Sequence, residues 1–187
     1  MPDVLAPVRP TPPANEAVIG PNGDRHSQAW TQYHKSVSDW ISAQGVGATD
    51  GSEATAGQVG EFKSVSVSAG APVAMGSYAA VNVTSLTLDA GDWDVWGNVV
   101  FSPDVTTAIA AITGWISTTP ATLPGALEAE GYTTIRASFL TGQHQALSVG
   151  RVRFLTTGPT LVYLSALAGF ATSSMVAYGA LYARRMR

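Results

Sequence analysis

From residue 61 to the C-terminus, apolar side chains recur at every second position in short segments separated by Gly, Pro, Asp and Asn. A period of two places successive side chains on opposite faces of a strand, so the pattern predicts β-strands. The eight segments cover residues 61–68, 79–88, 93–101, 107–118, 133–140, 145–156, 160–170 and 174–184. Short strands in this number, without a second convincing helix, predict a mainly β fold: an eight-stranded antiparallel jelly-roll sandwich over 61–187.

The third of these segments is apolar on both of its faces. One face carries Trp93, Val95, Gly97, Val99 and Phe101, which are the better core residues, and the other face carries Trp96 and Val100. Charged residues make up only 12% of the chain, about half of the usual share. A strand that is apolar on both faces predicts that one sheet packs against neighbouring copies of the chain. We therefore expect a homo-oligomer with Trp96 in its interface.

Composition and charge exclude several classes of protein. The formal net charge of −3 argues against nucleic acid as the main partner. The chain has no cysteine, so disulfides, thiolate zinc sites and thiol nucleophiles are excluded. No run of about 18 apolar residues and no apolar signal segment occurs, so we expect neither membrane insertion nor a secretory leader.

The region before residue 61 divides into three parts. Residues 1–26 are rich in proline and predict an extended docking arm. Residues 27–44 predict one short helix, ending before the glycine-rich flexible linker at 45–60. The helix has apolar residues spaced by three, four and three positions, which is a narrow stripe suited to a bundle of copies or to docking: Trp30, Tyr33, Val37 and Trp40.

Three carboxylates near the two tryptophans of the third segment raise the question of catalysis. Asp89, Asp92 and Asp94 are most simply a turn and solvated strand positions, because Asp and Gly are the usual turn residues. A glycan hydrolase would need paired acids in a cleft, and only Asp92, Asp94, Glu128 and Glu130 are candidates for that role. No spacing typical of a calcium or zinc site is present. We expect no enzyme activity, no metal and no cofactor.

The remaining polar candidates are few. His144, in the segment TGQHQ, is predicted to lie at a loop tip, and the alternative to a plain surface residue is one that contacts a sugar or receptor. Arg151 and Arg153 share one strand face, and Arg184, Arg185 and Arg187 cluster at the C-terminus. These arginines are expected at the surface or paired with acids across an interface.

Four segments together resemble a domain found at the C-termini of tailed-bacteriophage structural proteins of the fibre and decoration type. They are GQVGEFKSVSV, VNVTSLTLDAGDWDVWGNVVFSP, GWISTTPATLP and VAYGALYARRMR, within residues 57–187. The segment SQAWTQYHKSVSDWI also resembles the short helix that precedes trimeric domains in phage fibres.

The resemblance implies a homotrimeric, TNF-like jelly-roll knob on a virion, mounted through residues 1–26 on a tail, portal or capsid protein. It supplies no catalytic residues. It implies a fibre or spike component that could bind a host glycan through its knob. Two alternatives stay open: a capsid decoration or head-fibre protein that stabilises the shell, and a carbohydrate-binding lectin or glycan hydrolase.

Overall fold

The computed structural model describes residues 10–12, 28–43, 52–125 and 131–187. The chain divides into two compact units, residues 1–60 and residues 61–187. Most of the arm at 1–26 and residues 45–51 of the glycine-rich linker lie outside the described residues. The same is true of the acidic segment 126–130, which contains Glu128 and Glu130.

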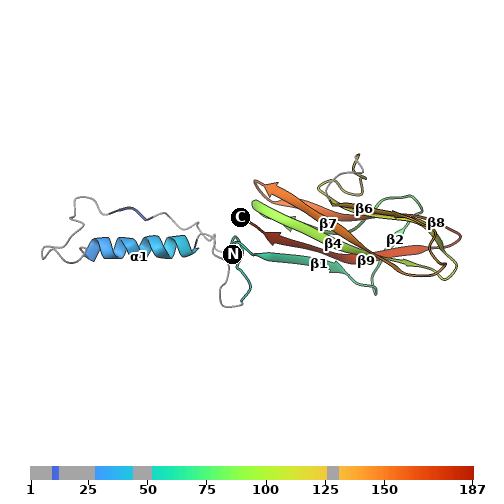
Figure 1. The fold of residues 1–187 in the computed structure, drawn as a ribbon, viewed down its shortest axis with the longest axis horizontal. Coiled ribbons are helices and arrows are strands. Elements are labelled where there is room, and N and C mark those ends of the chain that lie inside the picture. The colour runs from blue at the N-terminus through green and yellow to red at the C-terminus, as the bar shows by residue number, and fades with distance from the viewer. Residues whose placement is uncertain (1–9, 13–27, 44–51, 126–130) are drawn as a thin grey trace. The chain divides into compact units, whose positions relative to one another are not determined.

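The first unit contains one helix, α1 (Gln28–Ala43), shown in Figure 1. Trp30, Tyr33 and Val37 are partly exposed along one stripe of this helix, and the rings of Trp30 and Tyr33 meet edge to face at 5.5 Å. Trp40 belongs to α1, but its side chain lies outside the described residues. In the described part of the chain, no helix is long and apolar enough to span a bilayer.

The second unit is built from strands. The described residues contain nine: β1 (Phe62–Val67), β2 (Val73–Met75), β3 (Val81–Leu88), β4 (Gly91–Pro103), β5 (Ala108–Ser117), β6 (Tyr132–Arg136), β7 (Gln145–Thr156), β8 (Thr160–Ala171) and β9 (Met175–Arg185). They form two antiparallel sheets that pack face to face. The prediction of a mainly β sandwich with one short helix is confirmed.

The order of the strands is that of a jelly roll. One sheet runs β1-β9-β4-β7, seen side by side in Figure 1, and β2 also pairs with β9. The other sheet runs β3-β8-β5-β6. When β1 and β2 are counted as one interrupted strand, the eight resulting strands form the two interlocked Greek keys of this fold.

The predicted count of eight strands differs from the structure by the short strand β2. Its three residues follow Pro72 and pair with β9 beyond the point where β1 ends. The segment is too short to display a period of two, so the sequence carried no signal for it. The β-ladder with β9, supplied by the tertiary fold, is what makes it a strand.

The core lies between the two sheets, and the predicted core face of β4 is confirmed. Trp93, Val95, Val99 and Phe101 are fully buried there. From the other sheet, Ile112 and Leu164 are equally buried in the same cluster. On the opposite face of β4, Trp96 and Val100 remain partly exposed.

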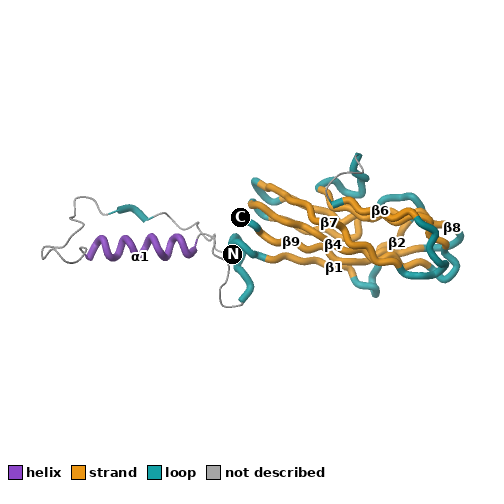
Figure 2. The backbone as a smooth tube through the Cα atoms, viewed as in Figure 1, coloured by secondary structure: helices purple, strands orange, loops and turns teal. Residues whose placement is uncertain are grey.

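The loops gather at two ends of the sandwich (Figure 2). Phe62 pairs with Arg184, so β1 begins where β9 ends. The opposite end carries the loops at 76–80, 104–107, 137–144 and 172–174, joined by hydrogen bonds such as Gly142 N–H to Thr107 O, 3.2 Å. We call this opposite end the distal end.

Candidate functional site

An aromatic cluster lies on the outer face of the β1-β9-β4-β7 sheet. Strand register places Tyr182 of β9 directly beside Trp96 of β4, and the ring of Phe62, at the start of β1, contacts both of their rings. The rings of Trp96 and Tyr182 stack with centroids 5.8 Å apart, and those of Phe62 and Tyr182 stack at 6.1 Å. We refer to Phe62, Trp96 and Tyr182 as the aromatic cluster.

A cation covers one edge of this cluster. The guanidinium of Arg151, from β7, lies 5.0 Å from the centroid of the Trp96 ring. The same guanidinium is 3.6 Å from the carboxylate of Asp94. A cation over an indole face is attracted by the negative face of the ring, so Arg151 is held against Trp96 by both partners.

Apolar side chains continue from the aromatic cluster along the same sheet face. Val100 of β4 pairs with Tyr178 of β9, and Ser102 pairs with Val176. Val100, Tyr178 and Val176 are all partly exposed. Aromatic residues and arginine are enriched in the cores of protein interfaces, whereas lysine is depleted. The face therefore has the composition of an interface more than that of an ordinary solvated surface.

The three aspartates near the tryptophans each contact a cation. Asp89 pairs with Lys63, Asp92 with Arg153 and Arg187, and Asp94 with Arg151. Asp92 is the exception to the expected solvated acids, because it lies within β4 and its side chain is only 6% exposed. Its two oxygens accept hydrogen bonds from Arg153 at 2.7 and 2.6 Å, a bidentate pair.

This arrangement makes Asp92 a poor acid or base. The hydrogen bonds from Arg153 lower the pKa of Asp92 from 3.8 to about 2; the hydrogen bond from Arg187 adds to this, while burial opposes it. A general acid needs a raised pKa and a general base one near the working pH. Asp92 and Asp94 therefore form a structural charge network and do not have the arrangement of paired catalytic carboxylates.

The lowered pKa predicts a loss of stability in acid. Because the folded-state pKa of Asp92 lies below its usual value, its contribution is complete above pH 3.8 and is lost as the pH falls through about 2. Urea unfolding of the full chain between pH 5 and pH 2 should show this decline. We expect the free energy of unfolding of Asp92→Asn to decline less steeply over that range than that of the natural chain. Parallel declines in the two proteins would contradict the role given to the Asp92 carboxylate.

A second ion pair lies beside the first and is more deeply buried. The Nε of Arg185 donates to Glu61 at 2.9 Å, and both side chains are 6% exposed. Arg185 also donates to the carbonyl oxygen of Ala90 at 2.6 Å, and its guanidinium lies 4.5 Å from the Trp93 ring centroid. Of the three C-terminal arginines, Arg185 and Arg187 are thus paired with acids inside one chain, where pairing across an interface had been one expectation.

The structure places the other predicted residues separately. His144 is exposed in the loop before β7, at the distal end. The stripe of α1 belongs to the other compact unit. Among the described residues, no group of three His, Cys, Asp or Glu side chains could hold a metal ion.

Sequence reasoning singled out Trp96 but missed its partners Phe62, Tyr182 and Arg151. Phe62 and Tyr182 stand 120 positions apart in the chain, so only the pairing of β1 with β9 brings them together. A signal existed in the alternation of β9, where Val176, Tyr178, Ala180 and Tyr182 fall on the face opposite to Ala177, Leu181 and Ala183.

A comparison with protein-family models and one with curated proteins gave no match. Among solved structures, the chain is similar to a chain of the T13 particle of infectious bursal disease virus, with a TM-score of 0.41 and 17% identity over 75% of this chain and 35% of that one. A structure of the Gx strain of this virus is similar with a TM-score of 0.42 and 17% identity, over 75% of this chain and 36% of that one. The VP2 subviral particle of this virus is similar with a TM-score of 0.41 and 16% identity, over 75% of this chain and 36% of that one. The chain spans about a third of the length of these viral chains.

Proposed function

We propose that this chain is a non-enzymatic structural component of a virion that assembles as a homotrimer through the outer face of the β1-β9-β4-β7 sheet. The aromatic cluster carries the proposal. Three stacked aromatic rings on a strand-paired surface, with apolar side chains beside them, are costly to leave in water and are typical of contact surfaces. A second copy of the chain is the occupant that the low overall charge favours.

The virion setting and the number of copies come from the sequence resemblance to phage fibre and decoration proteins. In this proposal residues 1–26 dock on a tail, portal or capsid protein. The stripe of α1, formed by Trp30, Tyr33, Val37 and Trp40, packs against the same stripe of the other copies. Phe62 begins β1 at one end of the sandwich, so a chain mounted through its N-terminus presents the distal end and His144 outward.

The aromatic cluster predicts the effect of a single charge. Trp96→Glu should weaken association by about 2–4 kcal/mol for each interface, because truncating or charging a central aromatic residue removes an anchor of this size. The molar mass of the full chain in solution, measured by light scattering over a range of micromolar concentrations, reports the change.

Leu161→Glu is the matched control, since Leu161 is an exposed leucine on a strand of the other sheet. We expect a trimer for the natural chain and for this control, and a dissociating species for Trp96→Glu. A natural chain that is monomeric, or a Trp96→Glu variant as trimeric as the control, would refute the proposed assembly.

Labelling on intact particles tests the location. Antibody against the chain should mark the tail or a vertex if it is a fibre or spike, and a regular array over the shell if it is a decoration protein. A particle preparation free of the chain would refute the virion assignment.

A further inference from the structure

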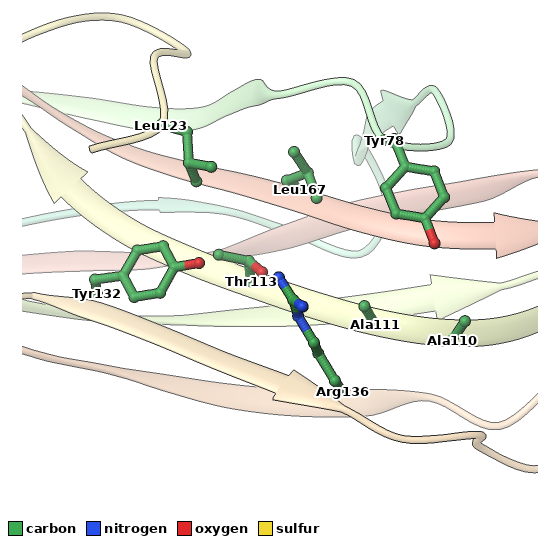
Figure 3. Close-up of a pocket in the computed structure, with 8 residues that line it drawn as sticks. All are labelled: Tyr78, Ala110, Ala111, Thr113, Leu123, Tyr132, Arg136 and Leu167. Carbon is green, nitrogen blue, oxygen red and sulfur yellow. The ribbon is translucent and has the colours of Figure 1, made fainter. Parts of the chain in front are cut away.

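A hollow lies on the outer face of the other sheet, β3-β8-β5-β6, and has a volume of about 390 Å³ (Figure 3). In Figure 3, Leu123, Leu167 and Tyr78 lie on one side of β5, and Tyr132 and Arg136 lie on the other. The hollow is separate from the aromatic cluster, because the two belong to different sheets.

Two rows of cross-strand neighbours form the floor of the hollow. In one row Arg136 of β6 pairs with Ala111 of β5, which pairs with Gly169 of β8. In the next row Thr113 lies opposite Leu167. Ala111 is a small residue on this sheet face and leaves space above it, while the absence of a side chain at Gly169 makes room for the ring of Tyr78.

Tyr78 forms a wall at one end of the hollow. Its φ of 57° lies in the left-handed region, which is unfavourable for a tyrosine. Its N–H donates to Ala168 O at 2.8 Å, while the Ser77 hydroxyl donates to Phe170 O at 2.6 Å. The ring lies so close over Gly169 that a Cβ there would meet it at 2.4 Å. Tyr78 is therefore strained and fixed to β8, yet its side chain is 67% exposed. Backbone strain of this kind is found most often at binding and active sites.

A loop closes the other end. The N–H of Ala121 donates to the side-chain oxygen of Asn82 at 2.6 Å, and the Ser165 hydroxyl donates to the same oxygen at 2.9 Å. These bonds hold the loop that follows β5 against the sheet, where Leu123 projects over the hollow. Both ends of the hollow are therefore held by hydrogen bonds to the strands beneath.

The charge of the hollow comes from Arg136. Arg151, Arg153, Arg185 and Arg187 all pair with carboxylates, whereas Arg136 makes no ion pair within the described residues. Tyr78 and Tyr132 line the same hollow. The hollow thus combines one available cation, two tyrosines and apolar walls.

We propose that this hollow binds a carboxylate-bearing sugar unit of a glycan. Arginine holds a carboxylate through two parallel hydrogen bonds. Tyr78, which is exposed, and Tyr132, which is partly exposed, offer ring surface for the apolar side of a sugar and hydroxyls for its polar groups. A pocket of this size lies within the range of small-ligand sites. The identification of the sugar as part of a host glycan rests on the proposed virion role, but the pocket itself is contained in one chain.

Titration of the full chain with glucuronate and N-acetylneuraminate, followed by ligand-observed NMR, tests the proposal. We expect both acids to bind and glucose, which lacks the carboxylate, to bind at least about tenfold more weakly. Arg136→Met should weaken binding of the acids by about tenfold or more, since it removes the charged donor. Ala111→Leu should do the same by filling the hollow.

Arg184→Met is the control, because Arg184 is exposed and lies outside the hollow, and it should not change the affinity. His144→Ala tests the rival contact at the distal end, which is also outside the hollow. Acetate that binds as tightly as glucuronate would overturn the sugar assignment, and acid sugars that fail to bind would overturn the proposal. Binding that is lost in His144→Ala but kept in Arg136→Met would place the receptor contact at the distal end instead. A monomeric chain that still binds glucuronate would refute the proposed trimer and leave the hollow supported.

Discussion

Replacing Glu61 with alanine is expected to lower the free energy of unfolding by about 3–5 kcal/mol. The change leaves the guanidinium of Arg185, which is 6% exposed, without its carboxylate. Removing one member of a buried ion pair is costly because the remaining charge has lost both its solvent and its partner. Urea unfolding of the full chain, followed by tryptophan fluorescence, measures the loss.

Two further variants separate this effect from a general loss of surface charge. Asp94→Ala breaks a pair whose arginine, Arg151, is 70% exposed, and should cost about 0–1 kcal/mol. Glu61→Ala combined with Arg185→Met should recover much of the stability, because no unpaired charge is then buried. If Glu61→Ala lowers the free energy of unfolding no more than Asp94→Ala does, the ion pair between Glu61 and Arg185 does not stabilise this end of the sandwich.

The second large effect is expected at Trp93. Trp93→Ala should lower the free energy of unfolding by about 3–5 kcal/mol, because the ring is fully buried and its removal leaves a cavity. The ring also lies 4.5 Å from the Arg185 guanidinium and 5.3 Å from the Lys63 ammonium. The variant therefore removes an attraction for two cations as well as packed volume.

A comparison of two conservative variants isolates the indole hydrogen bond. The Nε1–H of Trp93 donates to Asp89 O at 3.0 Å, whereas the Nε1–H of Trp115 has no hydrogen-bond partner within the described residues. Trp93→Phe loses a bond and should cost more than Trp115→Phe, which removes an unsatisfied buried donor. Equal losses at the two sites would show that ring volume alone determines the cost.

The alternation of side chains was sufficient to predict the sandwich. The segments expected at 145–156 and 160–170 agree with β7 (Gln145–Thr156) and β8 (Thr160–Ala171) to within one residue, because alternation and turn residues act locally. The core face of β4 followed from the same pattern. β2 escaped prediction because its pairing with β9, and not its own three residues, makes it a strand.

Features that depend on contacts between distant positions could not be predicted. Glu61 and Arg185 are separated by 124 positions, and nothing in the neighbourhood of either residue indicates the other. The hollow depends on Gly169 and Ala111 becoming neighbours and on the hydrogen bonds that hold Tyr78 over them. The apolar outer face of β4 that carries Trp96 could be recognised in the sequence because it is a local property, and the interface expected there stays a prediction.

The pairing of β1 with β9 determines how the sandwich would respond to a mechanical load. Hydrogen bonds in an antiparallel ladder run perpendicular to the strands, and Phe62–Val67 forms such a ladder with Gly179–Arg184. A pull on the chain at residue 61 would act along β1 and strain all of these bonds together, in shear, so the edge would not unzip bond by bond. The ion pair between Glu61 and Arg185 would pass the same force directly to β9, a strand held by β1, β2 and β4. A domain tethered at this end is therefore arranged to resist tension between its mounting and whatever its distal end holds.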